Sequence, residues 1–341
     1  MRAVVMRGSS LVVDEVADPV PAAGQALVQV RACGICGSDL HFLQHAERLA
    51  ELSSQVDAPV AAPLDLSRDI VMGHELCAEV LEYGPDTTGP APGTLVTSVP
   101  VLLTMAGVVP LAYNNDYPGG YAERMLLSPP LLLEVPNGLD HRRAALTEPL
   151  AVGIHAVARS KIAAGEAAVV LGCGPVGLAV VAGLKLAGIA PVVAADFSAR
   201  RRQLAEALGA DVVVDPATED VVAAWRRIDG RRPLVIFEAV GTPGMIATAM
   251  KAAPSRARIL VVGVCMEDDT VQPFFGIAKE LDVQFSFAYD PMEFAGALHA
   301  IADGRVDVDP LITGVVDLDG VPDAFSELAH PDRHAKILVE P

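Results

Sequence analysis

Positive charge is scarce in this sequence, and that scarcity excludes one class of partner. The chain has 25 Lys and Arg residues against 43 Asp and Glu residues, which gives a net charge of -18 at pH 7. Nucleic-acid binding depends on clustered basic side chains that neutralise phosphates. The short basic runs here are not embedded in a basic face, so we expect no nucleic-acid partner.

Long apolar runs are also missing. The sequence has no stretch of about 18 apolar residues that could cross a membrane. The N-terminus, MRAVVMRGSSLVVDEV, alternates like a pair of strands and lacks the continuous apolar core and the cleavage site of a signal peptide. We therefore expect a cytoplasmic protein without membrane contacts.

Cysteine and aromatic residues are both few. An odd number of cysteines spread over a long chain does not form a disulfide framework, so any cysteine with a function is expected to be a ligand. The five are Cys33, Cys36, Cys77, Cys173 and Cys265. Aromatic residues make up 4% of the chain although 52% is hydrophobic, and the excess lies in Ala, Val and Leu. This composition suits a Val-rich parallel sheet covered by Ala- and Leu-rich helices.

A change in residue pattern along the sequence divides the chain into two domains, as its length of 341 residues also suggests. Residues 1–155 carry short β-branched runs between Pro and Gly residues, typical of a β-rich domain. Residues 156–290 alternate apolar strands with helical segments, which predicts a doubly wound parallel sheet. Residues 291–341 contain a helical stretch and a final strand, AKILVE, which we expect to return to the first domain. The predicted fold class is α/β.

A glycine fingerprint follows the first strand of the second domain. Gly172, Gly174 and Gly177 form the pattern G-x-G-x-x-G between a strand and an apolar helix, which is the context that a dinucleotide site requires. The first glycine permits a tight turn, the second admits a pyrophosphate and the third allows close packing of helix and strand. The helix N-terminus offers free N–H groups to the anion. An ordinary glycine-rich turn is the alternative interpretation.

The end of the next strand indicates which dinucleotide is bound. Asp196 lies where a carboxylate would accept hydrogen bonds from the ribose hydroxyls of the adenosine, and this favours NAD. One of the three arginines at 200–202 could instead bind a 2′-phosphate, but Asp196 would repel that phosphate; a solvated helix face also explains the arginines. The predicted cofactor contacts are Gly172, Gly174, Pro175, Val176, Gly177, Asp196, Arg201, Val240 and Val264.

Two short segments of the first domain could supply a metal site. Cys36 begins CGSDLH, and His74 and Glu75 lie in GHE. A thiolate, an imidazole and a carboxylate give a mixed donor set suited to zinc, and the third protein ligand would be Glu148 or Glu75. Cys33 and Cys36 also form C-x-x-C. A redox dithiol is the weaker interpretation, because the pair follows a strand of the β-rich domain rather than starting a helix in a βαβ unit.

Taken together, these motifs resemble the zinc-containing medium-chain alcohol dehydrogenases, and especially their sorbitol and threonine dehydrogenase branch. The shared forms are GICGSDLH, GHE, EPLAV, GCGPVG and FEAVGTPG, in the same order along essentially the whole chain. The resemblance implies a GroES-like β-rich catalytic domain joined to a Rossmann domain that binds NAD. It also implies an enzyme that moves a hydride between an alcohol, expected to be secondary, and NAD, with one catalytic zinc per subunit.

The resemblance also implies roles for individual residues. Cys36, His74 and Glu148 would ligate zinc, and Glu75 would be an alternate ligand that exchanges with water. The remaining roles concern the proton and the orientation of the ligands: Ser38 would contact the substrate hydroxyl, His41 would end a proton relay to solvent and Asp39 would orient His74.

The sequence departs from the family in one lobe and one loop. Where many relatives carry four cysteines and a structural zinc, VLLTMAGVVPLAYNNDYPGGYAERM has no cysteine, so we expect no structural zinc. Apolar packing of residues such as Leu102, Leu103 and Met105, or a contact between subunits, would hold this lobe instead. The chain between His41 and Gly73 is longer than usual and is expected to border the substrate site.

Apolar residues indicate the kind of alcohol that the enzyme would take. Leu102, Leu103, Met105, Phe42 and Phe275 favour hydrophobic secondary alcohols over polyols.

The strand VQFSFA could pair across a two-fold axis, so a homodimer or homotetramer is expected. Two other functions stay open: a zinc-free quinone or enone reductase of the same superfamily, and a non-catalytic dinucleotide-binding protein.

Overall fold

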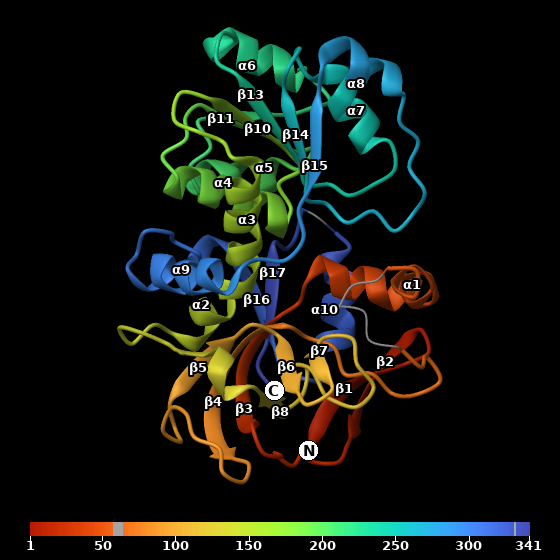
Figure 1. Cartoon of the computed structure of the whole chain (residues 1–341), viewed down its shortest axis with the longest axis vertical. Coiled ribbons are helices and arrows are strands. Elements are labelled where there is room, and N and C mark those ends of the chain that lie inside the picture. The colour runs from red at the N-terminus through yellow and green to blue at the C-terminus, as the bar shows by residue number, and fades with distance from the viewer. Residues whose placement is uncertain (57–63, 331) are drawn as a thin grey trace.

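Two lobes are stacked along the long axis of the molecule (Figure 1). The computed structural model describes residues 1–56, 64–330 and 332–341. The lower, β-rich lobe contains both ends of the chain, and the upper, α/β lobe is built from the middle of the sequence (Figure 1). No helix in the described residues is both long and apolar enough to span a membrane.

The β-rich lobe is built on a seven-stranded sheet of order β16-β17-β3-β4-β5-β9, in which β8 also pairs with β3. Two antiparallel pairs, β1-β2 and β6-β7, lie outside this sheet. The elements from the first part of the chain are β1 (Arg2–Arg7), β2 (Ser10–Glu15), β3 (Ala26–Gly34), α1 (Gly37–Ser53), β4 (Glu75–Tyr83), β5 (Leu95–Ser98), β6 (Val101–Thr104), β7 (Gly107–Pro110), β8 (Arg124–Leu127), η1 (Pro129–Leu131), β9 (Leu132–Glu134) and α2 (His141–Ala145).

The end of the chain completes this lobe. After α9 the chain forms two strands that join the same sheet, β16 parallel to β17, and β17 antiparallel to β3. The elements are α9 (Pro291–Ala302), η2 (Asp309–Leu311), β16 (Ile312–Val316), α10 (Val321–Leu328) and β17 (Lys336–Val339). Residues from opposite ends of the sequence therefore share one sheet.

The α/β lobe contains a six-stranded parallel sheet of order β12-β11-β10-β13-β14-β15. Its elements are α3 (Thr147–Ser160), β10 (Ala167–Leu171), α4 (Pro175–Leu186), β11 (Val192–Ala195), α5 (Ala199–Ala207), β12 (Val212–Val214), α6 (Val221–Asp229), β13 (Leu234–Glu238), α7 (Met245–Ala252), β14 (Arg258–Val261), α8 (Pro273–Lys279) and β15 (Asp282–Phe285). The strand order reverses beside β10, which is where ligands bind in such sheets.

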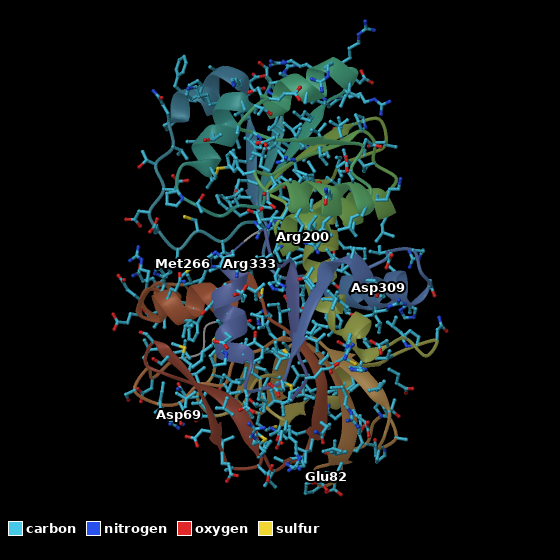
Figure 2. The ribbon with its side chains drawn as sticks, turned by 180° about the vertical axis from the view of Figure 1, so that it is seen from behind. Asp69, Glu82, Arg200, Met266, Asp309 and Arg333 are labelled. Atoms are coloured by element: carbon cyan, nitrogen blue, oxygen red, sulfur yellow. The ribbon has the colours of Figure 1, made fainter. Side chains whose placement is uncertain are left out.

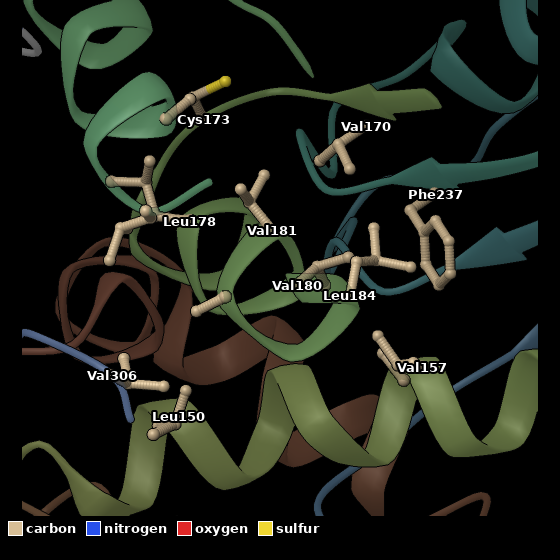
Figure 3. Packing of buried hydrophobic residues seen from close by; sticks show 14 of the residues in the cluster. Leu150, Val157, Val170, Cys173, Leu178, Val180, Val181, Leu184, Phe237 and Val306 are labelled. Atoms are coloured by element: carbon tan, nitrogen blue, oxygen red, sulfur yellow. The ribbon is translucent and has the colours of Figure 1, made fainter. Parts of the chain in front are cut away.

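Helices cover both faces of this sheet, so its central strands β10 and β13 are buried almost throughout. Figure 3 shows one face, where Leu150 and Val157 of α3 and Leu178 and Leu184 of α4 belong to the same apolar cluster as Phe237 of β13. This packing fixes the position of α4, and with it the glycine loop at the N-terminus of that helix.

The cysteine-free segment is held by apolar packing, but the sequence assigned its residues only partly correctly. Leu102 is fully buried, Leu103 is 39% exposed and Met105 is fully exposed. The prediction was therefore wrong for Met105, because this residue lies in the turn between β6 and β7, beyond the strands, whereas alternation along β6 separates Leu102 from Leu103. Phe275 was also misplaced: it lies in α8 and packs against the core of the α/β lobe.

Helix α1 lies beside the junction of the two lobes. The loop that follows β14 and carries Met266 runs past this junction (Figure 2), and Asp268 in it pairs with Arg48 of α1, with 3.0 Å between Oδ1 and Nη2. Part of the long segment expected to border the substrate site forms the second half of α1. The remainder includes residues 57–63, which lie outside the described residues.

Candidate metal and nucleotide site

The pairing of β3 with β4 brings two distant motifs together. Gly34 at the end of β3 is opposite Glu75 at the start of β4 in an antiparallel register. Cys36 follows β3 and begins helix α1, and His74 directly precedes β4. Both side chains therefore lie at the same edge of the sheet.

Three donor atoms meet at this edge. A sulfur of Cys36, a ring nitrogen of His74 and a carboxylate oxygen of Glu75 all lie within 4.8 Å of one another. A thiolate, an imidazole and a carboxylate together suit Zn²⁺ better than the all-oxygen sets that Ca²⁺ or Mg²⁺ prefer. The donor set and its spacing thus fit a zinc ion. No second group of this kind occurs in the part of the chain that the structure describes.

Glu148 lies outside the group of three, in the first turn of α3. Its side chain is buried, and burial raises the pKa of Glu148 to about 7, while His74 and Lys336 nearby oppose that rise. A hydrogen bond with Tyr289, which precedes α9, also lowers the pKa of Glu148. Of the two carboxylates that the sequence left open as third ligand, the structure groups Glu75 with Cys36 and His74.

Lys336 of β17 binds the Glu75 carboxylate at both oxygens. The distances from Nζ to Oε1 and Oε2 are 2.6 and 2.7 Å, and Nζ also donates to the carbonyl of Ile35 at 3.0 Å. Both charged side chains are almost completely buried. Burial lowers the pKa of Lys336, but the charges of Glu75, Cys36 and Glu148 and the hydrogen bond to Glu75 together raise it more, so the lysine remains a cation. The sequence reasoning missed Lys336, which lies 261 residues from Glu75.

Asp39 accepts several hydrogen bonds behind His74. The carboxylate is fully buried and accepts from the backbone N–H of Cys36 at 3.0 Å, from the Tyr121 hydroxyl at 2.6 Å and from the Tyr113 hydroxyl at 3.0 Å. His74 Nδ1 lies 3.5 Å from Asp39 Oδ1, too long for a good hydrogen bond, and has no hydrogen-bond partner among the described residues. Burial raises the pKa of Asp39, but the contacts with His74 and the hydrogen-bond donors lower it more.

The two relay residues differ in their surroundings. The Ser38 hydroxyl is half-buried and lies 3.0 Å from the hydroxyl of Tyr113. His41, one turn further along α1, is exposed. Partial burial and the neighbouring His45 lower the pKa of His41, which favours the neutral imidazole. The structure thus leaves Ser38 half-buried against Tyr113 and His41 at the surface.

The glycine fingerprint has the geometry of a pyrophosphate-binding turn. Gly172 has φ of 88°, a value that residues with a side chain rarely adopt. A Cβ on Gly177 would lie 1.9 Å from the Gly172 carbonyl oxygen, so only glycine fits there. A Cβ on Gly174 would meet no atom within 4 Å, which leaves open space in front of the first turn of α4. That space is where an anion would meet the free N–H groups of the helix.

Asp196 is anchored next to this turn. Its carboxylate accepts the backbone N–H groups of Cys173 and Ser198, both at 2.8 Å, and Arg201 Nη1 lies 3.9 Å from it. Arg202 donates to two backbone carbonyls and faces Asp215 at 3.3 Å. A carboxylate has lone pairs left for further donors, so Asp196 can still accept from a ribose diol.

The other predicted cofactor contacts lie near the fingerprint or at strand ends. Pro175 and Val176 begin α4 directly after the glycine turn. Val240 follows β13 and Val264 follows β14, and both are about half exposed, at 40% and 50%. Because parallel strands end at one edge of the sheet, these side chains and the glycine turn occupy the same edge.

Tyr113 and Tyr121 are site residues that the sequence reasoning missed. Three of the five tyrosines in the chain fall between residues 113 and 121, in the segment that lacks cysteine. This clustering is a signal that the sequence did offer. It did not indicate that two of these hydroxyls reach the buried Asp39.

Comparison with family models agrees with this arrangement. Residues 22–137 match the model of the alcohol dehydrogenase GroES-like domain, and residues 175–303 match that of the zinc-binding dehydrogenase. The matches confirm the predicted fold class, a GroES-like β-rich domain joined to a Rossmann-type parallel sheet.

Individual relatives cover almost the whole chain. The (R,R)-butanediol dehydrogenase of Bacillus subtilis (strain 168) is 32% identical over 96% of both chains, and sorbitol dehydrogenase of Gallus gallus is 28% identical over 99% of this chain and 95% of its own. A crystal structure from Sinorhizobium meliloti 1021, assigned as a zinc-binding dehydrogenase and bound to NADP, is 30% identical with a TM-score of 0.83, covering 100% of this chain and 99% of its own.

Proposed function

Because the chain belongs to the zinc-dependent medium-chain dehydrogenase family, we propose that it oxidises a secondary alcohol by transferring a hydride to NAD, and reduces the matching ketone in the reverse direction. The observation that carries this proposal is the group formed by Cys36, His74 and Glu75, whose donor atoms lie within 4.8 Å of one another. A dinucleotide turn without a metal site would instead suit a zinc-free reductase.

We assign Cys36, His74 and a carboxylate as the zinc ligands. Glu75 occupies the carboxylate position in this arrangement, and Glu148, buried on α3, is the second carboxylate available. When bound, zinc would polarise the alcohol oxygen and lower the pKa of the hydroxyl. Lys336 compensates the Glu75 charge, so that the buried site does not hold three uncompensated anions.

The chain's own residues would handle the substrate and its proton. Ser38 would accept the hydrogen bond of the alcohol hydroxyl, and exposed His41 would pass the proton to solvent. Asp39, whose Oδ1 lies 3.5 Å from His74 Nδ1, would orient the His74 ring by its negative charge, which leaves Nε2 for the metal. Buried Tyr121 and Phe42, with half-buried Tyr113, would exclude water from the side of the site that faces the β-rich lobe.

A secondary alcohol is favoured by the relatives rather than by the predicted apolar wall. The matched proteins include dehydrogenases of butanediol and sorbitol. Of the five apolar residues expected at the substrate site, Phe42 packs beside Tyr113, whereas Phe275 lies in α8. The enzyme is therefore expected to accept small secondary alcohols and diols.

We further propose NAD as the cofactor and one zinc per chain. Asp196 places a negative charge where the 2′-phosphate of NADP would lie, and Arg202 is already engaged by backbone carbonyls and Asp215. The described residues include a single donor group of the kind that holds zinc.

The partner is proposed to be a second copy of the chain, forming a homodimer or homotetramer, because β15 is an edge strand with exposed aromatic side chains.

The function is tested by metal content followed by kinetics. Protein purified without chelator should contain about one zinc per chain by plasma mass spectrometry. It should reduce NAD with 2,3-butanediol or another secondary alcohol, with a lower KM for NAD than for NADP. The C36S variant should lose both the zinc and the activity while retaining its circular dichroism spectrum. A zinc-loaded protein that oxidises no member of a broad alcohol panel would refute the proposal.

The cofactor assignment has its own matched variant. Asp196→Asn keeps an acceptor for the N–H of Cys173 but removes the negative charge. The variant should therefore gain activity with NADP, about 10-fold or more in kcat/KM, because the carboxylate charge no longer repels the 2′-phosphate. The loss in kcat/KM with NAD should be smaller than this gain. A charge-assisted contact is worth roughly 1.5–3 kcal/mol, and about 1.4 kcal/mol corresponds to a factor of ten. A wild-type enzyme that prefers NADP would contradict the assignment.

A further inference from the structure

Tyr113 connects the cysteine-free segment to the reaction site. Its hydroxyl oxygen lies 3.0 Å from Ser38 Oγ and 3.0 Å from Asp39 Oδ1. Its ring packs against Phe42, with 4.4 Å between centroids, and meets His74 edge-on at 6.1 Å. No other hydroxyl in the described residues contacts Ser38 Oγ.

Only one of the two contacts can use the single phenolic proton of Tyr113. Ionised Asp39 is an acceptor and has nothing to donate, and a hydrogen bond to a carboxylate is stronger than one to a neutral hydroxyl. The phenolic proton is therefore donated to Asp39. The Tyr113 oxygen is left as an acceptor, and the hydroxyl that can donate to it at 3.0 Å is that of Ser38.

This order fixes the direction of the Ser38 hydroxyl. The one hydrogen of Ser38 points at Tyr113, so its lone pairs are free to accept a hydrogen bond from a group bound near Cys36, two residues earlier in the chain. A serine held in this way accepts a hydrogen bond from the substrate hydroxyl, and it would pass a proton on toward His41 only after turning its own hydrogen away from Tyr113. Hydrogen bonds in such a chain also strengthen one another.

We propose that Tyr113 is a positioning residue for alcohol binding: by donating to Asp39 and accepting from Ser38, it presents the Ser38 oxygen as an acceptor to the substrate hydroxyl. The inference rests on the proposed function, since it requires that an alcohol binds beside Ser38. It assigns a role in the site to the segment in which the sequence showed only the loss of four cysteines.

The backbone around Tyr113 holds the hydroxyl in place. Leu111 is fully buried, and Asn114 is 7% exposed. The Asn114 side-chain oxygen accepts the backbone N–H groups of Asp116 at 2.7 Å and of Tyr117 at 3.0 Å, which closes a tight turn directly after Tyr113. Together with the Phe42 contact, this turn restricts the ring to one orientation.

The test uses two inert probes of opposite hydrogen-bonding character on the zinc-loaded enzyme. Trifluoroethanol is bound to the dead-end complex with NADH, which lacks the positive nicotinamide that favours the alkoxide, so it keeps its hydroxyl proton and needs Ser38 as an acceptor. Dimethyl sulfoxide, bound to the complex with NADH, has only an acceptor oxygen and gains from Ser38 only if that residue donates. The dissociation constants are measured by titration for wild type, Y113F, S38A and the double variant.

The proposal expects shifts that differ between the two probes. Y113F frees the Ser38 hydroxyl to rotate, so trifluoroethanol binding should weaken about 10-fold, whereas dimethyl sulfoxide binding should stay the same or improve. S38A should weaken trifluoroethanol binding to a similar extent and leave dimethyl sulfoxide binding unchanged. In the S38A background, Y113F should add less than about 2-fold, because the two residues act as one unit.

Y117F is the matched control for the same segment. The Tyr117 hydroxyl has no hydrogen-bond partner among the described residues, so this variant should bind both probes as wild type does. Because Phe fills the volume of Tyr, Y113F should also retain its zinc and its circular dichroism spectrum. Should Y113F not fold, the S38A comparison alone still tests the direction of the Ser38 hydroxyl.

Several results would overturn the inference. In Y113F, these results are equal weakening of the binding of both probes, or unchanged binding of trifluoroethanol. In S38A, they are loss of dimethyl sulfoxide binding, or an effect of adding Y113F that is as large as in the wild-type background. Failure of the proposed function would be visible separately, as a zinc-loaded wild type that oxidises no secondary alcohol, because probe binding requires no turnover.

Discussion

Cys36 has a different environment from most of the other thiols. It is half-buried within the donor group, whereas Cys33, Cys77 and Cys173 are fully buried. Burial raises the pKa of Cys77 and of Cys173 to about 12, and raises the pKa of Cys33 well above its ordinary value. Since the thiolate is the reactive form, these three thiols should resist alkylation in the folded protein.

We therefore predict that zinc controls the alkylation of Cys36. Treatment of the native protein with iodoacetamide at pH 8 should modify Cys265, which is partly exposed, and spare Cys36. After removal of the metal with a chelator, Cys36 should become modified as well, because its sulfur is no longer a metal ligand. Peptide mass spectrometry before and after chelation measures this difference. Equal modification of Cys36 in both samples would contradict its role as a ligand.

At the scale of elements, the β6-β7 hairpin of the cysteine-free segment depends on apolar packing. Leu102 is fully buried in the core of the β-rich lobe, and Met105 at the tip is fully exposed. Neighbouring positions on one hairpin thus differ in what they contribute, although the sequence VLLTMAGVV makes them look alike.

The predicted consequence is a large difference between two substitutions on this hairpin. Leu102→Ala should destabilise the protein by about 2–5 kcal/mol, because it removes buried methyl groups and leaves a cavity. Met105→Ser should change the stability by less than about 0.5 kcal/mol. Thermal denaturation of both variants beside wild type checks this. Similar melting temperatures for the two variants would show that the hairpin does not depend on its buried face.

The last strand is also tied down by charge. Glu340, directly after β17, contacts Arg142 of α2 at 2.6 and 3.1 Å and His141 at 2.9 Å. The hydrogen bond from Arg142 lowers the pKa of Glu340, with a smaller contribution from His141, while burial opposes the change. These contacts of Glu340 connect the C-terminal strand β17 to helix α2, which leads into the α/β lobe.

The Glu340 contacts should therefore stabilise the fold in a pH-dependent way. A folded-state pKa below that of the unfolded chain, about 4.3 for Glu, gives stability that is present above that pH and lost as the pH falls through the folded pKa. Glu340→Gln should lower stability by about 0.5–1 kcal/mol at pH 7, a small value because both partners are partly exposed. The gap in melting temperature between wild type and variant should close toward pH 3. A gap that persists there would mean that the amide, and not the charge, is responsible.

At the scale of the whole molecule, β15 leaves an open sheet edge. It is the outer strand of the six-stranded sheet. Phe285, its last residue, is 61% exposed, and Phe287, shortly after it, is 68% exposed. Exposed aromatic side chains on an edge strand are unusual in a monomer. They favour pairing with a second copy across a two-fold axis.

We predict that substitutions on this edge dissociate the protein. In sedimentation at micromolar concentration, wild type should have the mass of two or four chains, and Phe285→Glu with Phe287→Glu should shift it toward smaller species. Val20→Ser is the control, because Val20 is 82% exposed but lies in the β-rich lobe. A wild type that sediments as a single chain would exclude the dimer.

The sequence by itself determined the features whose signal is local. The spacing of Gly172, Gly174 and Gly177 predicted the turn, because the backbone conformation and close contacts that require glycine there involve mostly residues nearby in the sequence. The order of strands and helices predicted the α/β fold class for the same reason. The motifs around Cys36 and His74 predicted a donor group, because ligand chemistry is a property of residue type.

Only the tertiary structure decided which groups face one another. Lys336 pairs with Glu75 across 261 residues, and Tyr113 reaches Ser38 from a segment that the sequence described only by what it lacks. The grouping of the Glu75 carboxylate with Cys36 and His74 is of the same kind. The physical reason is that such contacts depend on sheet register and side-chain packing, and neither is encoded in the spacing of any one motif.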